Sequence, residues 1–164
     1  MPAAKHNASP SPNPGDDRVR RSGGSKPIEV RPLSILSIST AFEDHQVLRE
    51  ILKDSGWRIT QARTCREGLA RLSRRHMPLV ICESNLPDGT WRDMVHRIHA
   101  LAPPPVLIVT SRLADDHLWA EVLNLGGYNV LAKPFRESEV KFMISSVWRS
   151  KHGPASQASS VGTA

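Results

Sequence analysis

The side chains best suited to chemistry follow four short apolar segments of the sequence, each at the point where its segment ends. They are Ser39 and Thr40 after residues 33–38, Glu83 after residues 79–82, Thr110 after residues 106–109, and Lys133 after residues 129–132. Short apolar runs of this kind are typical of buried strands, and the carboxyl ends of parallel strands meet at one edge of a sheet. A carboxylate, hydroxyls and an ammonium would then form one cluster of complementary charge.

Helical patterns separate these predicted strands. Apolar side chains recur at helical spacing over about residues 40–55, between Thr64 and Pro78, and over about residues 91–101, 115–125 and 137–149. A weaker strand over residues 57–62 belongs near a sheet edge. Five strands alternating with five helices predict an α/β fold, a doubly wound five-stranded parallel sheet that right-handed crossovers cover on both faces.

Local spacing also predicts how three helices begin. Thr40 with Glu43, and Thr64 with Glu67, match the capping box, in which a hydroxyl and a carboxylate three residues later satisfy free N–H groups at a helix start. Asp88 is expected to cap the helix that begins at Trp91.

The charge of the chain is concentrated at its two ends. The net charge is +6, but residues 33–148 hold 14 Lys or Arg against 13 Asp or Glu, so only +1 belongs to that central part. Residues 1–31 and 151–164, rich in small and polar residues, are predicted to be disordered tails of one domain, residues 32–150. Because no basic stripe is interleaved with aromatic residues, nucleic-acid binding is not expected.

The remaining composition argues against several classes of protein. Met1 is followed by polar residues and no apolar run is long enough to span a membrane, so a cytoplasmic location is expected. The two cysteines, Cys65 and Cys82, are too few for a disulfide framework or a zinc site, and Cys82 is predicted to be a buried, inert thiol. No glycine-rich loop follows residues 33–38, so the phosphate cradle of a nucleotide-binding protein is missing.

Taken together, these segments resemble the receiver (CheY-like) domain of two-component response regulators. The matching stretches are LSILSIST, CESNLPDG, IVTSR and LGGYNVLAKPF, in that order, and the resemblance covers about residues 33–150. It implies a flavodoxin-like (βα)5 fold. It also implies that a receiver accepts a phosphoryl group on an aspartate after the third strand, with Mg²⁺ held by that aspartate and by an acidic pair after the first strand. Thr110 and Lys133 match the residues that hold the phosphoryl oxygens, and the resemblance implies a cis peptide bond between Lys133 and Pro134.

Three positions depart from the pattern of the family. Glu83 stands where the phosphoacceptor aspartate is expected, and Ser39 and Thr40 stand where the acidic pair is expected. Mg²⁺ requires hard anionic oxygens in near-octahedral geometry, so the loss of these carboxylates predicts weak or absent Mg²⁺ binding. The extra methylene of Glu83 also displaces its oxygens from the acceptor position. Val130 occupies the position of the switch aromatic, which puts coupling between that residue and Thr110 in doubt.

The sequence therefore predicts a stand-alone pseudo-receiver domain, not an enzyme, that acts in phosphorelay signalling through protein–protein contact. No output domain is expected, since about fifteen polar residues follow the last helix. Glu83 would either hold an active-like state or pair with Lys133 in a single inert conformation, and the second interpretation is favoured. The first alternative is phosphorylation on a non-standard acceptor, Ser39, Thr40 or Glu83. The second is a flavodoxin-like cofactor binder.

A protein partner, either a histidine kinase or a downstream effector, follows from the same resemblance. The surface of helices 115–125 and 137–149 is the predicted partner face, and a homodimer through this face is a further option. Trp119, Leu123 and Trp148 are its candidate contact residues, because aromatic side chains dominate binding hot spots.

Overall fold

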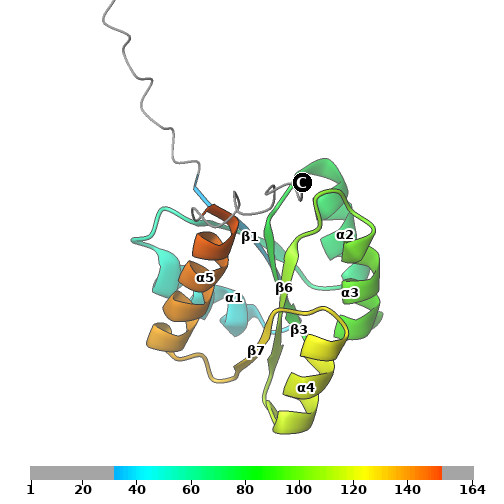
Figure 1. Cartoon of the computed structure of the whole chain (residues 1–164). Helices are drawn as coiled ribbons and strands as arrows, with labels where there is room; N and C mark the ends of the chain where they lie inside the picture. The colour runs from blue at the N-terminus through cyan, green and yellow to red at the C-terminus, as the bar shows by residue number, and fades with distance from the viewer. Residues whose placement is uncertain (1–31, 153–164) are drawn as a thin grey trace, which may run out of the picture. The chain divides into compact units, whose positions relative to one another are not determined.

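Five strands form a single parallel sheet in the order β2-β1-β3-β6-β7 (Figure 1). The computed structural model describes residues 32–152. The strands are β1 (Ser34–Ile38), β2 (Arg58–Ala62), β3 (Leu79–Glu83), β6 (Val106–Ser111) and β7 (Asn129–Ala132), and β2 is an edge strand as predicted. The helices are α1 (Phe42–Leu52), α2 (Cys65–Arg74), α3 (Trp91–His99), α4 (Asp116–Asn124) and α5 (Glu137–His152). This arrangement confirms the doubly wound, flavodoxin-like fold.

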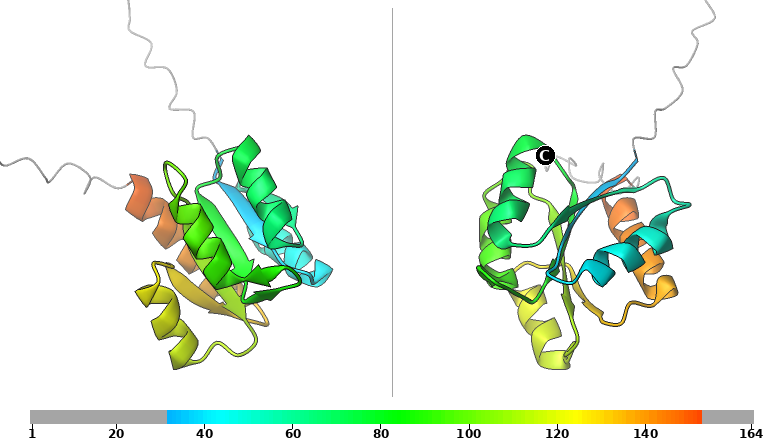
Figure 2. Two further views of the ribbon diagram at one scale, coloured as in Figure 1. Left: turned by 90° about the vertical axis from the view of Figure 1, so that its right-hand side faces the viewer. Right: turned by 180° about the vertical axis from the view of Figure 1, so that it is seen from behind.

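Helices cover both faces of the sheet because the strands are apolar on both sides. Helices α1 and α5 lie on one face, and α2, α3 and α4 lie on the other (Figures 1 and 2). Successive strand residues point to opposite faces. Leu36, Val80 and Leu107 accordingly belong to the core beneath α2 and α3, whereas Ile35 and Ile81 belong to the core beneath α1 and α5.

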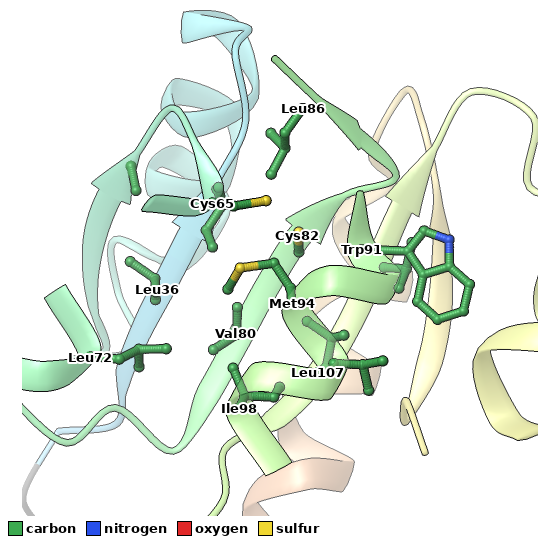
Figure 3. Close-up of a cluster of buried hydrophobic side chains, with 14 of the residues drawn as sticks. Leu36, Cys65, Leu72, Val80, Cys82, Leu86, Trp91, Met94, Ile98 and Leu107 are labelled. Atoms are coloured by element: carbon green, nitrogen blue, oxygen red, sulfur yellow. The ribbon is translucent and has the colours of Figure 1, made fainter. Parts of the chain in front are cut away.

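The core on the α2 and α3 side contains both cysteines (Figure 3). Cys65 and Cys82 are free thiols, and both are buried in the cluster that also contains Met94 and Trp91. Burial raises the pKa of the Cys65 thiol to about 11 and raises the pKa of the Cys82 thiol further still. Both sulfurs therefore stay protonated at neutral pH and contribute to packing, as predicted for Cys82.

Two short strands that follow β3 build a small hairpin outside the main sheet. Strands β4 (Asn85–Leu86) and β5 (Gly89–Thr90) pair antiparallel across the turn that precedes α3. Asp88, in this turn, accepts hydrogen bonds from the N–H groups of Cys65 (2.8 Å) and Arg66 (2.9 Å), at the start of α2. The prediction that Asp88 caps α3 is wrong, because Thr90 and Asp93 already form the capping box of that helix.

The capping box predicted at the start of α1 is also absent. Ala41 occupies the N-cap without a side-chain hydrogen bond, so Thr40 and Glu43 do not form a capping box. The Thr40 hydroxyl is instead directed to Glu83. Helix α5 extends to His152, two residues past the predicted domain boundary. The predicted tail over residues 1–31 lies outside the described residues. Within residues 32–152, none of the helices has the length and apolarity needed to cross a membrane.

Candidate functional site

The predicted cluster assembles at the carboxyl edge of the sheet. Glu83 is the last residue of β3, the central strand, and Ser39 and Thr40 directly follow the neighbouring β1. Thr110 lies on β6, in register with Glu83, and Lys133 directly follows β7. The strand order thus brings residues from four segments to one place, as the sequence predicted.

Both carboxylate oxygens of Glu83 are engaged. Oε1 accepts a hydrogen bond from the Lys133 ammonium at 2.8 Å. Oε2 accepts from the Ser39 hydroxyl (3.1 Å) and from both the backbone N–H and the hydroxyl of Thr40 (3.2 Å each). Burial alone would raise the pKa of this carboxyl, but the bonds from Lys133 and Thr40 outweigh it and hold the pKa below its usual value. Glu83 is therefore a fixed negative charge at neutral pH.

A second carboxylate, which the sequence analysis missed, completes the cluster. Asp44, in the first turn of α1, forms an ion pair with Lys133 through Oδ2. The same oxygen accepts a hydrogen bond from the Ser39 hydroxyl at 2.6 Å. The expectation of a single carboxylate facing Lys133 is corrected, since the ammonium contacts both Glu83 and Asp44. The only signal in the sequence is an acid six residues after the end of β1, in the first turn of the following helix.

A buried histidine supports the loop that carries Ser39. His45, which is 2% exposed, contacts the Ser39 carbonyl oxygen through Nε2 (3.0 Å) and the Ser37 hydroxyl through Nδ1 (2.9 Å). A carbonyl can only accept, so Nε2 carries the ring proton and Nδ1 accepts from Ser37. Desolvation lowers the pKa of His45, which favours this neutral form. The ring therefore fixes the backbone from which Ser39 reaches the cluster.

Thr110 and Lys133 both lie at the carboxyl edge of the sheet, as predicted. Their contacts differ, because among the described residues Lys133 joins the Glu83 cluster and the Thr110 hydroxyl does not. Thr110 is 2% exposed, and within residues 32–152 no hydrogen bond joins its hydroxyl to Glu83 or Lys133. The Lys133 backbone N–H donates to the Ser111 carbonyl at 2.9 Å, and the Lys133–Pro134 peptide bond is cis, as the resemblance implied. The lysine backbone is thus anchored to β6 while its side chain reaches across to β3 and α1.

The residues present do not fit a bound Mg²⁺ ion. Ser39 and Thr40 supply hydroxyls where the family uses carboxylates. The two acids in the cluster, Glu83 and Asp44, both contact the Lys133 ammonium. A divalent ion among these oxygens would lie against a positive charge, which opposes its binding. No reaction step is derived through such an ion.

The surface predicted as the partner face contains a groove, and the residues that line it differ in part from the predicted candidates. A groove of about 400 Å³ lies between α4, β7 and α5, and Trp119, Val130 and Phe142 help to line it. Trp119 is 49% exposed and donates a hydrogen bond to the Asn129 side chain, and Leu123 is exposed beside it on α4. Phe142, which the sequence analysis missed, is 69% exposed.

Trp148 does not belong to this groove. It packs against the core on the α1 side and stacks on His152, with 3.8 Å between the ring centroids. Six residues separate Trp148 from Phe142, which corresponds to about 240° around the helix at 100° per residue. The placement of Trp148 beside Trp119 is therefore wrong, because the two aromatic residues of α5 lie on different sides of that helix.

A parallel sheet of this strand order, with a carboxylate, a buried hydroxyl and a lysine at its carboxyl edge, matches the arrangement that the resemblance to two-component receiver domains implies. The family model of the response regulator receiver domain matches residues 40–145, and the chain belongs to that family.

Curated relatives carry the same domain in longer chains. The probable transcriptional regulatory protein TcrX of Mycobacterium tuberculosis is 29% identical over 124 residues, covering 73% of this chain and 51% of its own. The KDP operon transcriptional regulatory protein KdpE of Escherichia coli is 28% identical over 103 residues, covering 60% and 45%. The chain thus spans about half the length of these two relatives.

Solved structures share the fold. The signal receiver domain of an HD domain-containing protein from Pseudomonas fluorescens matches with a TM-score of 0.68 at 26% identity, covering 74% of this chain and 98% of that one. The chemotaxis response regulator CheY4 of Vibrio cholerae matches with a TM-score of 0.65 at 19% identity, covering 71% and 98%.

Proposed function

We propose that this receiver domain acts in two-component signalling by binding a protein partner, without phosphorylation at Glu83 and without enzymatic activity of its own. The observation that carries this proposal is the state of Glu83. One of its oxygens bonds to Lys133 and the other to Ser39 and Thr40, so hydrogen bonds engage both oxygens and lower their nucleophilicity toward a phosphoryl donor.

The electrostatics of the site support the same conclusion. Phosphoryl transfer depends on cations that neutralise the charge developing on the transferred group, and Mg²⁺ is the main one. Here the acidic pair is replaced by Ser39 and Thr40, and the remaining acids are held by Lys133. The site keeps the lysine and Thr110, but both of its carboxylates are paired with that lysine and neither is left unpaired to recruit the metal.

The phosphorylation claim is tested by incubating the full chain with Mg²⁺ and phosphoramidate, followed by intact mass measurement. We expect no added phosphoryl group. A matched control is the triple variant Ser39→Asp, Thr40→Asp, Glu83→Asp, which restores the acids that the family uses and checks that the donor is active. A stoichiometric phosphoryl adduct on the wild-type chain would contradict the proposal and would favour the alternative of a non-standard acceptor.

The groove between α4, β7 and α5 is the proposed partner surface, for a histidine kinase or a downstream effector. Exposed Trp119 and Phe142 provide the large aromatic contacts that dominate protein interfaces. Trp119→Ala or Phe142→Ala should weaken capture of a partner from the native host, whereas Trp148→Ala, outside the groove, should not.

The same variants decide between a partner protein and a second copy of the chain. If sedimentation shows a dimer that Trp119→Ala dissociates, the groove is a homodimer interface. Equal capture by all three variants, with circular dichroism showing each to be folded, would remove the groove from the proposal.

A further inference from the structure

The Lys133 ammonium lies between two acids that the fold brings together from distant parts of the chain. Glu83 is 50 residues away in sequence and Asp44 is 89 residues away. The side chains are 6% exposed for Lys133, 16% for Asp44 and 22% for Glu83. The contact is therefore largely shielded from solvent, and it joins β3, α1 and the segment after β7.

The oxygens around the ammonium are the kind that a hard cation prefers. Glu83 Oε1 and Asp44 Oδ2 contact Nζ directly, and the Ser39 hydroxyl bridges the two carboxylates at 2.6 Å from Asp44 and 3.1 Å from Glu83. Carboxylate and hydroxyl oxygens are typical ligands of divalent metal ions. A lysine ammonium is a compact positive charge with three N–H donors, so it can bridge two carboxylates.

We propose that the Lys133 ammonium is the resident cation of this site, and that Asp44 is the positioning residue that holds it there in place of a divalent metal ion. The inference deepens the proposed function and rests on it. The sequence analysis expected one carboxylate at the site, and the structure has two, Glu83 and Asp44. On this proposal the additional acid serves to hold Lys133 and not a metal ion. With the Lys133 ammonium between them, the two carboxylates and the lysine carry a net charge of −1 instead of −2, which weakens the attraction for a divalent ion.

The surroundings of Asp44 favour this role. Ser39 has one hydroxyl proton, and its shorter contact is to Asp44. The Ala41 N–H donates to the Ser39 oxygen at 3.1 Å, which orients that proton away from the backbone. The neighbouring acid Glu43 is exposed and takes no part in the cluster. Asp44 is thus held in place for contact with Lys133.

One consequence concerns the partner surface. Lys133 lies between β7 and α5, and both of these elements border the groove that contains Trp119 and Phe142. The ion pairs with Asp44 and Glu83 tie this segment to α1 and β3 without any ligand. The groove should therefore keep the same conformation whether or not Mg²⁺ and a phosphoryl donor are present.

The proposal is tested by measuring Mn²⁺ binding to the full chain by isothermal titration calorimetry. Removing the resident cation in Lys133→Ala should expose both acids and tighten Mn²⁺ binding about tenfold or more relative to wild type. Adding Asp44→Asn to that variant should abolish the gain. Adding Glu43→Gln instead, the matched control on the same helix turn, should leave the gain intact.

Two results would overturn the proposal. They are Mn²⁺ binding by Lys133→Ala that is no tighter than binding by the wild type, and a gain in Lys133→Ala that survives the addition of Asp44→Asn. If circular dichroism shows that Lys133→Ala is unfolded, Lys133→Gln is titrated in its place. Mn²⁺ should also raise the melting temperature of whichever of the two variants is folded. An unchanged melting temperature counts against the proposal.

The outcomes also separate this inference from the proposed function. Phosphorylation of the wild-type chain would contradict the proposed function, whatever the Mn²⁺ titrations show. Absence of phosphorylation together with an Asp44-independent metal response would leave the proposed function standing and remove the role of Asp44.

Discussion

Replacing Lys133 by methionine removes the one positive charge from between Glu83 and Asp44 while keeping the length of the aliphatic side chain. Both acids would then be unpaired in a partly buried site, with only the bonds from Ser39 and Thr40 remaining. Removing one partner of a buried ion pair costs about 3–5 kcal/mol. Because the two acids are 16% and 22% exposed and so are only partly buried, we expect a loss somewhat below that range, about 2–3 kcal/mol in the free energy of unfolding.

The assay is urea unfolding followed by tryptophan fluorescence, with Lys141→Met as the matched control. Lys141 pairs with Glu137 on the surface of α5, where the two side chains are 48% and 65% exposed. Exposed pairs contribute about 0–1 kcal/mol, so this variant should be nearly neutral. An equal loss of unfolding free energy in Lys133→Met and Lys141→Met would show that the partly buried Lys133 ion pairs stabilise the fold no more than an exposed pair does.

The pH dependence provides a second check on the same variant. The pKa of Glu83 is lowered in the folded protein, so its contribution is present above its usual value of 4.5 and is lost as the pH falls through the lowered value. The difference between wild type and Lys133→Met should therefore shrink in acid. A difference that stays constant down to about pH 3 would show that lost packing, not charge, is responsible.

Three other variants test features near the site. Asp88→Ala should destabilise the domain by about 1 kcal/mol in urea unfolding, because two N–H groups at the start of α2 lose their acceptor; no change would contradict this cap. His45 has a lowered pKa, so stability should fall as the pH drops below about 6.5, and this fall should be smaller in His45→Gln; parallel pH profiles would contradict the assignment. Gly127→Ala should cost about 1–3 kcal/mol in thermal unfolding, because the added Cβ would lie 2.5 Å from Val122 Cγ1 and 3.0 Å from the Val122 carbonyl oxygen. A melting temperature equal to that of the wild type would show that this region relaxes.

The sequence predicted the sheet and most of the cluster for a definite physical reason. Buried parallel strands are short, apolar and ended by polar residues, and their carboxyl ends share one edge. Glu83 ends one such strand and Lys133 follows another, so the sequence alone places the two side chains together. The strand order brings the two residues to one edge of the sheet, where their side chains meet at 2.8 Å.

Asp44 could not be placed in the same way. It lies on a helix, and whether its side chain faces the cluster depends on how α1 packs on the sheet. Its position in the first turn of α1 has an ordinary alternative meaning, because acids there stabilise the helix dipole. Only the tertiary structure distinguishes the two roles.

The failed capping predictions share a cause. Thr40 and Asp88 have side chains suited to local helix caps, but each has a partner from a distant segment. The Thr40 hydroxyl donates to Glu83, and Asp88 accepts from the start of α2. The error at Trp148 has a different origin. Helix α5 carries apolar residues on several sides, so its pattern does not show which aromatic residue faces the groove.

The central claim is that the site keeps one conformation whether or not Mg²⁺ and a phosphoryl group are offered. Its most direct test is the amide NMR spectrum of the full chain, recorded before and after addition of Mg²⁺ and beryllofluoride, which mimics a phosphoryl group. We predict that the signals of Glu83, Thr110 and Lys133 stay in place. Saturable shifts of these signals, spreading to Trp119 on α4, would contradict the claim.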